Sequence, residues 1–227
     1  MTIAKPRMGR PRHLSEAQVL DAALTLIDEV GVDGLTMEQL AASLGVGTST
    51  VYGYVSSKQE LLDAVVDHVV ISAEVVALID RSDWRIAAEA FTHGFRAVLI
   101  AHPNLAVRWT TREVLSPRAV ESGRRLLEVM VEAGLPVESA AAAYFALESF
   151  TIGHVLWELP RLHAQPPQEY SRRLRAAASL AGWRTDLLVG VPDYIESATP
   201  DELFGRGIRL VLDGVEAQLS QRRRPRR

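Results

Sequence analysis

Apolar side chains recur at intervals of three and four residues along most of the chain, which is the spacing of one face of an α-helix. The segment 15–30 carries this stripe and ends at Gly31, a residue type that commonly stops helices. The same pattern predicts helices over residues 36–44, 48–54, 58–77, 84–101, 117–133, 137–159 and 199–219, and a short segment over residues 103–109 follows the helix that Pro103 ends. Residues 165–198 form a polar, arginine-rich connection whose helix content the pattern leaves open. No segment alternates as a β-strand does, so we predict an all-α fold.

Residues 35–62 contain two short predicted helices and the start of a longer one. Thr36 with Gln39 forms a capping box at the first helix, and Gly45 suits the left-handed position that ends it. A turn over residues 45–47 leads into the second helix, which Thr48 or Ser49 can cap. This arrangement is typical of the helix-turn-helix, whose second helix enters the major groove of DNA.

Composition excludes several classes of protein. The 227 residues include no cysteine, which excludes disulfides, zinc–thiolate sites and thiol nucleophiles. Residues 1–13 are basic rather than apolar, and charge interrupts every later apolar run before membrane-spanning length. We therefore expect a soluble, cytoplasmic protein with no membrane partner. A hydrophobic content of 48% is sufficient for one large or two small domains.

The charge is unevenly distributed, although its net value is only −3. Residues 1–14 hold basic side chains, including Arg10 and Arg12, and no acid, while residues 222–227 are mostly arginine. The body between these ends is therefore strongly acidic. Arginine is favoured in narrow minor grooves because negative potential is concentrated there. We expect Arg10 and Arg12 to contact the minor groove or the phosphates, and the alternative is a solvated terminus.

The N-terminal segment resembles the TetR family of bacterial transcriptional regulators. The resemblance is carried, at fixed spacing, by Gly31, Gly34-Leu35-Thr36, Leu40-Ala41, Leu44-Gly45-Val46, Thr50-Val51-Tyr52, Val55, Lys58 and Leu61-Leu62. It implies an arm and a three-helix, helix-turn-helix DNA-binding domain over residues 1–60. Residues 61–227 would then form a helical ligand-sensing and dimerisation domain with a basic C-terminal tail.

The resemblance also implies which residues contact DNA. Those expected at the duplex are Arg10, Arg12, Thr36, Thr48, Ser49, Thr50, Tyr52, Gly53, Tyr54 and Lys58. Tyr52, Tyr54 and Lys58 stand where family members contact phosphates, and Thr50 stands where members touch base edges. Hydroxyl and ammonium groups are suitable donors to phosphate oxygens, although Tyr52 has helix packing as its alternative role. Gly53 departs from the family pattern and offers no side chain to a base.

A ligand pocket within the C-terminal helices is a second implication of the resemblance. Its expected lining is mainly aromatic and apolar, as in most small-molecule sites, and consists of Glu74, Phe91, Phe95, Trp109, Leu126, Met130, Phe150, His154 and Trp157. The alternative is that these aromatic residues are plain core. The effector is unknown, and no cofactor is expected.

Two tryptophans argue against a tetracycline–magnesium ligand. Trp109 stands where the tetracycline repressor has a metal-binding histidine, and Trp157 stands where it has a carboxylate. We therefore expect an apolar or aromatic ligand, and any cationic group on it would pair with Glu74 or Glu148. The pairs His154/Glu158 and Glu89/His93 have i,i+4 spacing but no third ligand nearby in sequence, so we predict no metal site.

Two predicted helices, 137–159 and 199–219, indicate self-association. The first is largely apolar, and the second carries Gly207 and Gly214, which permit close helix approach. They resemble the two helices that pair across a two-fold axis in the tetracycline-repressor branch of the family. We therefore expect a homodimer, and the alternative is that both helices are buried within one subunit.

The most direct interpretation is a DNA-binding transcriptional regulator, usually a repressor, that a small molecule releases from double-stranded operator DNA. One alternative is an architectural or protein-controlled DNA-binding factor that has no small-molecule effector. A helical enzyme is the other, but the sequence contains no nucleophile elbow, His-Glu-x-x-His, P-loop or dinucleotide fingerprint. We therefore predict that the protein is not an enzyme.

Overall fold

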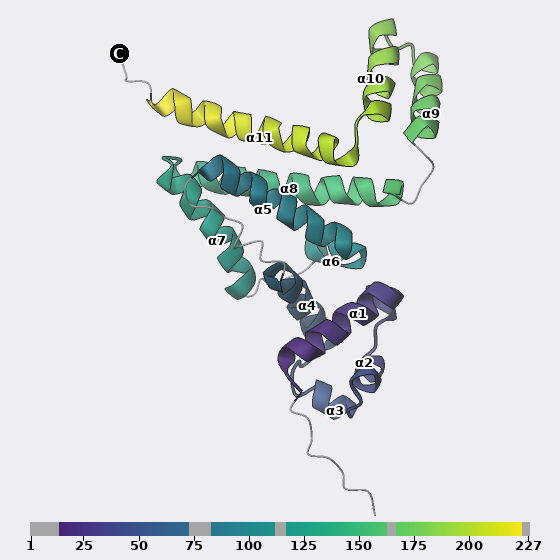
Figure 1. Cartoon of the computed structure of the whole chain (residues 1–227), viewed down its shortest axis with the longest axis vertical. Helices are drawn as coiled ribbons and strands as arrows, with labels where there is room; N and C mark the ends of the chain where they lie inside the picture. Colours follow the sequence, from purple (N-terminus) through teal and green to yellow (C-terminus); the bar gives the residue numbers. More distant parts are fainter. Residues whose placement is uncertain (1–13, 73–82, 112–116, 163–166, 224–227) are drawn as a thin grey trace, which may run out of the picture. The chain divides into compact units, whose positions relative to one another are not determined.

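The computed structural model describes residues 14–72, 83–111, 117–162 and 167–223, and it contains helices but no strand in these ranges (Figure 1). The helices are α1 (Glu16–Gly34), α2 (Met37–Leu44), α3 (Thr48–Val51), α4 (Lys58–Ser72), α5 (Trp84–Ala101), α6 (Pro103–Thr111), α7 (Pro117–Glu132), α8 (Val137–Leu162), α9 (Pro167–Leu180), α10 (Thr185–Ser197) and α11 (Pro200–Arg223). The chain divides into two compact units, Met1–His68 and Val69–Arg227, at a point within α4.

Local capping sets the helix boundaries of the first unit. Ser15 and Gln18 form a capping box at α1, and Thr36 and Gln39 form one at α2, so each box satisfies the backbone N–H of its cap residue and one free N–H of the first turn. The regular part of α1 ends at Gly31, whose φ of 78° and ψ of 167° interrupt the helix as its sequence position predicts. Glycine is suited to this conformation because it has no Cβ to clash.

The first unit closes around a small apolar core. Its fully or almost fully buried side chains come from all four helices and their connections, and they include Val19, Ala23, Ile27, Leu35, Leu40, Val51, Leu61 and Val65. His68 of α4 lies 2.7 Å from the Asp21 carboxylate of α1, which adds a polar tie between these two helices. The helix-turn-helix is therefore held by packing against α1 and α4 rather than by its own short elements.

Helix α8 is the central element of the larger unit, because α5, α6, α7 and α11 all pack against it. The largest buried side chains of this unit line the contacts, and they are Phe95, Leu99, Leu126, Met130, Leu147, Phe204, Ile208 and Leu212. A helix covered from several directions must be apolar over most of its circumference. The long apolar segment predicted from residue 137 meets that requirement, and the helix continues past Pro160 to Leu162.

A buried ion pair joins α5 to α8. The Arg96 guanidinium donates from Nε to Glu158 Oε2 at 3.1 Å and from Nη2 to Glu158 Oε1 at 2.7 Å. Its third nitrogen, Nη1, donates to Asp201 Oδ1 at 2.7 Å, and its charge lies 5.0 Å from the ring centroid of Phe204. One guanidinium therefore connects three helices, since Asp201 and Phe204 belong to α11.

The approach of α11 to α8 depends on a glycine. A Cβ atom added to Gly207 would lie 2.0 Å from Cζ of Phe150, which is far inside van der Waals contact. The Phe150 ring also stacks on Phe204, with centroids 5.8 Å apart. Gly207 therefore serves packing within this unit, whereas a Cβ added to Gly214 would meet no atom within 4 Å.

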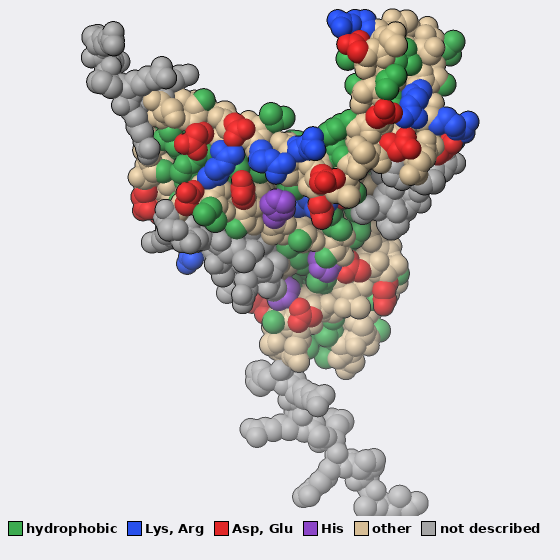
Figure 2. Space-filling model, turned by 45° about the horizontal axis from the view of Figure 1, so that its top comes forward, with side chains coloured by type: hydrophobic (Ala, Val, Ile, Leu, Met, Phe, Trp, Pro, Cys, Tyr) green, Lys and Arg blue, Asp and Glu red, His purple; other side chains and the backbone are tan. Residues whose placement is uncertain are grey.

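The structure settles one segment that the sequence pattern left open and shortens one predicted helix. The arginine-rich connection contains two helices, α9 and α10, which pack on each other and are tied by Ser171 Oγ donating to the Pro192 carbonyl at 3.1 Å. Their arginines lie beside carboxylates, as Figure 2 shows, and Arg175 Nη2 is 2.5 Å from Asp193 Oδ1. Helix α3 is shorter than its predicted span, because the chain turns at Tyr52 and Gly53 instead of continuing as helix to Tyr54.

Within the described ranges, no helix combines the length and the apolar character that crossing a membrane requires.

Acid is predicted to destabilise the fold through His154. Burial lowers the pKa of His154, an effect that nearby Glu158 opposes and Arg96 reinforces, while a hydrogen bond to the Pro200 backbone also opposes it. The unfolded chain binds this proton near its ordinary pKa of about 6.5, and the folded chain binds it only at lower pH. Stability is therefore present above about pH 6.5 and lost as pH falls through the folded pKa.

As the pH is lowered below about 6.5, the melting temperature should fall more steeply for the wild type than for His154→Gln. Parallel curves for the two proteins would show that His154 does not contribute the effect.

Candidate functional site

The turn of the helix-turn-helix is built by Gly45, Val46 and two buried valines. Gly45 has a φ of 68°, and its N–H donates to the carbonyls of Ala41 and Ala42 at the end of α2. Val51 and Val55 are buried, so they anchor the single turn of α3 and the segment after it against the core. Most of the other side chains of this short element face solvent.

The exposed face of α3 and the following turn carries mainly hydroxyl groups. Ser49, Thr50, Tyr52, Gly53 and Tyr54 are exposed, and 49% of Tyr52 is accessible. Exposed hydroxyls on a helix-turn-helix are suited to contact phosphates and base edges. Thr48 is half-buried at the start of the helix. Five of the residues predicted to contact DNA are thus exposed on α3 and the turn after it, although their contacts to DNA stay a prediction.

Three of the predicted DNA-contacting residues also have partners within the protein. Thr36 accepts the N–H of Gln39 as the cap of α2. The Tyr54 hydroxyl donates to the carbonyl of Leu14, and Lys58 Nζ donates to the carbonyl of Asp33 at 3.2 Å. An ammonium group has three donors, so Lys58 retains capacity for a phosphate. The Tyr54 contact fixes the point at which the N-terminal arm joins α1.

The backbone angles at position 53 do not require a glycine, because Gly53 is not among the glycines with positive φ. A Cβ added there would lie 3.1 Å from the Thr50 carbonyl oxygen, which is a tight contact. Glycine therefore relieves crowding at the end of α3 and leaves this part of the exposed surface flat.

Positive charge is scarce in the first unit outside its basic arm. Lys58 is the sole lysine or arginine between residues 14 and 68, where acids are numerous. Arg10 and Arg12, which carry the other predicted cationic contacts, lie outside the described residues, as does Glu74 of the predicted ligand site. Phosphate attraction is therefore expected to depend on the arm.

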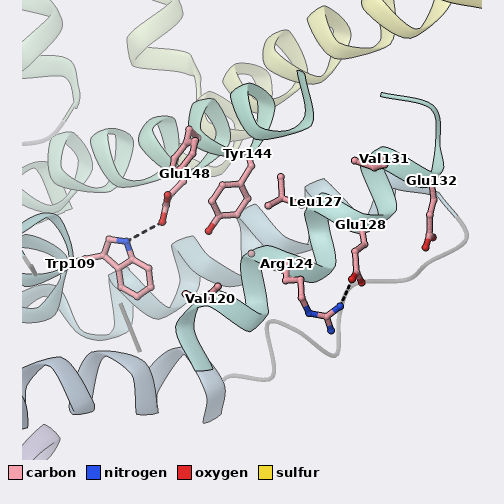
Figure 3. Close-up of a pocket in the computed structure, with 11 residues that line it drawn as sticks. Trp109, Val120, Arg124, Leu127, Glu128, Val131, Glu132, Tyr144 and Glu148 are labelled. Atoms are coloured by element: carbon pink, nitrogen blue, oxygen red, sulfur yellow. Dashed lines mark hydrogen bonds and ion pairs between the residues drawn. The ribbon is translucent and has the colours of Figure 1, made fainter. Parts of the chain in front are cut away.

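The larger unit contains a pocket of about 570 Å³ between α6, α7 and α8 (Figure 3). Its lining is largely apolar with four charged groups, and it consists of Trp109, Val120, Gly123, Arg124, Leu127, Glu128, Val131, Glu132, Tyr144, Phe145 and Glu148. Both the volume and the character of the lining are typical of small-molecule sites.

Three aromatic side chains shape this pocket. Trp109 of α6 donates from Nε1 to Glu148 Oε1 of α8 at 3.3 Å, and its ring lies 4.7 Å from that of Phe95. Tyr144 of α8 lies so close to α7 that a Cβ added to Gly123 would be 2.9 Å from its hydroxyl oxygen. Phe145 is 61% exposed. Gly123 therefore lets the Tyr144 ring lie against the neighbouring helix.

The guanidinium of Arg124 is engaged by two carboxylates on its own helix. It donates to both oxygens of Glu121, at 2.7 and 2.5 Å, and to Glu128. This bidentate contact lowers the pKa of Glu121, and both carboxylates raise the pKa of Arg124. Because these groups are exposed, solvent screens the interaction and its main effect is to orient Arg124 along α7.

Of the residues predicted to line a ligand site, Trp109 lines this pocket. Phe91, Phe95, Leu126 and Met130 are buried in the core, whereas Phe150 and His154 surround Phe204, with His154 centred 5.3 Å from that ring. Trp157 is 39% exposed on another face of α8. The structure thus places Trp109 at the pocket and the other described residues of the predicted set elsewhere. The role of these residues in binding a ligand stays a prediction.

Sequence reasoning missed most of the α7 contribution. Val120, Leu127 and Val131 line the pocket, although none of them was among the residues predicted to form a ligand site. The available signal was that α7 has more apolar positions than one packing face can hold. Glu148 was expected only as a partner for a cationic group, and it does lie at this pocket.

A second exposed surface runs along α8 and α11. Its small and apolar residues are Ala146, Ser149, Gly153 and Trp157 of α8 and Leu210, Gly214 and Ala217 of α11. Leu210 is 75% exposed, and a Cβ added to Gly153 or Gly214 would meet no atom within 4 Å. We name this surface the α8–α11 stripe. It has the composition that close helix packing requires.

In the two pairs considered as metal ligands, each carboxylate lies beside an arginine. His154 Nε2 lies 3.7 Å from Glu158 Oε2, but the Glu158 carboxylate is bound by Arg96. Glu89 lies 3.8 Å from Arg85. Among the residues that the structure describes, no group of three or more His, Asp or Glu is placed to hold a metal.

Comparison with known proteins covers both units. Residues 19–65 match the model of bacterial regulatory proteins of the tetR family, and residues 78–219 match that of the tetracyclin repressor-like C-terminal domain. The chain is 28% identical over 232 residues to the HTH-type transcriptional repressor DrrR1 of Streptomyces coeruleorubidus, which covers 96% of this chain and 83% of the relative. It is 30% identical over 208 residues to the class A tetracycline repressor from transposon 1721 of Escherichia coli, covering 87% and 88%.

Solved structures of similar fold include two regulators from Streptomyces coelicolor. The TetR regulator SCO7222 superposes with a TM-score of 0.76 at 29% identity, covering 90% of this chain and 98% of the other. ActR in complex with actinorhodin superposes with a TM-score of 0.77 at 26% identity, covering 92% and 99%. Because both family models match and together they span the helix-turn-helix and the helical unit that contains the pocket, the chain belongs to the TetR family of bacterial transcriptional regulators.

Proposed function

We propose that this protein is a transcriptional repressor that binds operator DNA as a homodimer and is released by a small molecule bound between α6, α7 and α8. The observation that carries the proposal is the pairing of an exposed, hydroxyl-rich helix-turn-helix with an aromatic pocket in a separate unit. The structure of the related ActR contains bound actinorhodin, which supports a small-molecule effector for this protein. The pocket favours this function over a protein-controlled factor with no effector.

Two copies are needed to bind a symmetric operator. One α3 contributes a single helical turn, which offers few base contacts. Helix-turn-helix dimers place their reading helices about 34–36 Å apart, or a multiple of this, so that both enter the major groove on one side of the duplex. The α8–α11 stripe is the surface that we assign to the dimer. Ligand binding would favour a head spacing that no longer fits both half-sites.

The arm is expected to supply much of the electrostatic affinity. Replacing Arg10 and Arg12 together with glutamine should weaken operator binding and lower the slope of log affinity against log salt by about two, because each lost phosphate contact lowers it by about one. The same double change at the exposed Arg172 and Arg173 of α9 alters net charge equally and serves as the control. A salt slope that is equal in both variants would contradict this role.

Dimerisation is predicted to require the α8–α11 stripe. Gly153→Arg should produce a monomer in sedimentation experiments without unfolding it, since the position is open in the subunit. Operator affinity should fall by about 10²-fold or more, because bivalent binding is lost. Gly190→Arg, at an equally open position on α10, should leave the dimer intact. A dimeric Gly153→Arg protein would place the interface elsewhere.

Filling the pocket should uncouple the effector from DNA. Val120 lines the pocket and is half exposed, so Val120→Trp can occupy the space without disturbing the core. In a screen for compounds that release the operator, the variant should need at least about tenfold more of any active compound and still bind the operator as the wild type does. Val137→Trp, at an exposed site outside the pocket, is the matched control. Equal release of all three proteins would remove the pocket from the mechanism.

A further inference from the structure

We propose that the pocket between α6, α7 and α8 selects flat aromatic molecules that carry a positive charge, and that Glu148 is the main residue that distinguishes them from neutral analogues. This inference rests on the proposed function, because it names the chemical class of the effector. It goes beyond that function because it assigns specificity to a particular carboxylate.

The shape of the pocket favours a planar ring system. Trp109 from α6 and Tyr144 from α8 both present rings to it, and Val120 and Leu127 of α7 add apolar side chains to the lining (Figure 3). The indole of Trp109 is held in place at its N–H by Glu148 and at its ring by Phe95. Aromatic walls held in this way bind flat ligands by stacking, and they also attract cations through the negative faces of their rings.

The charges of the described lining residues favour a cation. There are three carboxylates, of Glu128, Glu132 and Glu148, and one guanidinium, of Arg124. The guanidinium already donates to Glu121 and Glu128, so it is poorly placed to receive an anionic ligand as well. An acid group on the ligand would therefore enter a region in which carboxylates outnumber the cation that could bind it.

Glu148 is the carboxylate best placed to read the charge of a ring. Its side chain is half-buried and bonded to the indole of Trp109, whereas Glu132 is exposed at the edge of the pocket. Figure 3 shows Glu148 beside Trp109 and Tyr144, the two rings against which a ligand would stack. An ionic interaction gains strength as water is excluded, so Glu148 should contribute more selectivity than Glu132.

A charge series on one ring system tests this directly. The probes are 10-methylacridinium, acridine and acridine-9-carboxylate, which carry a positive, no and a negative charge at mildly alkaline pH. Isothermal titration of the full-length protein without DNA should show the cation binding at least about tenfold more tightly than acridine, with the carboxylate weakest. Equal affinities, or tighter binding of the carboxylate, would overturn the proposal.

Substitutions then locate the selectivity. Glu148→Gln should reduce the affinity for methylacridinium by about tenfold while changing that for acridine by no more than about twofold. Glu138→Gln, an exposed carboxylate in the first turn of α8 outside the pocket, should leave both affinities unchanged. If Glu148→Gln folds poorly, Glu132→Gln provides a second test. It should reduce the affinity for methylacridinium by a smaller factor and leave the affinity for acridine unchanged. Unchanged selectivity in both pocket variants would refute the assignment.

Failure of this inference can be told apart from failure of the proposed function. Release of operator by methylacridinium is compared between wild type and Val120→Trp, because intercalation of the dye into DNA would affect both proteins equally. Pocket-dependent binding of the cation without release supports the selectivity and contradicts the repressor mechanism. Release by a neutral or anionic compound that binds the same pocket supports the mechanism and overturns the selectivity.

Discussion

The larger unit depends on the ion pair between Arg96 and Glu158. Glu158 is almost completely buried, and an unpaired carboxylate there would carry a large desolvation cost. Arg96 donates to both of its oxygens, so the Glu158 carboxylate is satisfied only when α5 and α8 are both in place. The same guanidinium also donates to the exposed Asp201 of α11. The stacking of Phe204 on the same guanidinium adds an apolar contact to this junction. The pair thus favours one arrangement of three helices over alternatives of similar hydrophobic content.

Fixing α8 in this way places three surfaces with different roles. One face of the helix packs on α5 and α6 through Val155, which is completely buried beside Phe95, Leu99 and Ala106. A second carries Tyr144 and Glu148 to the pocket, and a third contributes Gly153 to the α8–α11 stripe. Under the proposed function, α8 would be shared by the ligand site and the subunit interface, which is a physical route by which occupancy of the pocket can bias the arrangement of a dimer. No long-range network needs to be assumed for this coupling.

In the DNA-binding unit, some side chains serve both the fold and the expected contact with DNA. Tyr54 and Lys58 bond to the carbonyls of Leu14 and Asp33, so the same side chains that are suited to meet phosphates also brace the reading element. With acids numerous and Lys58 the sole lysine or arginine over residues 14–68, non-specific attraction to DNA by this part of the chain is weak. Affinity would then depend on the basic arm and on the simultaneous fit of two heads, which makes binding sensitive to their spacing.

Features set by neighbouring residues were predictable from the sequence. The capping boxes at Ser15, Thr36 and Thr199 involve partners three residues away, and the glycines at 31 and 45 stop helices by their own backbone freedom. The helix-turn-helix, the all-α class and the family followed from such local signals. The helices α9 and α10 were left open because they carry many arginines and carboxylates, which pair on the surface and weaken the apolar periodicity on which the prediction depended.

Tertiary structure alone decided which apolar face meets a neighbour and which meets a cavity. Periodicity shows that Phe95 and Leu127 lie on inward faces, but it gives no account of the space opposite them, and Phe95 is core whereas Leu127 lines the pocket. The contacts of Arg96 with Glu158 and of Tyr54 with Leu14 likewise join positions far apart in the chain. Such contacts depend on how helices cross, which is settled by the packing of the whole unit and not by the spacing of residues along one element.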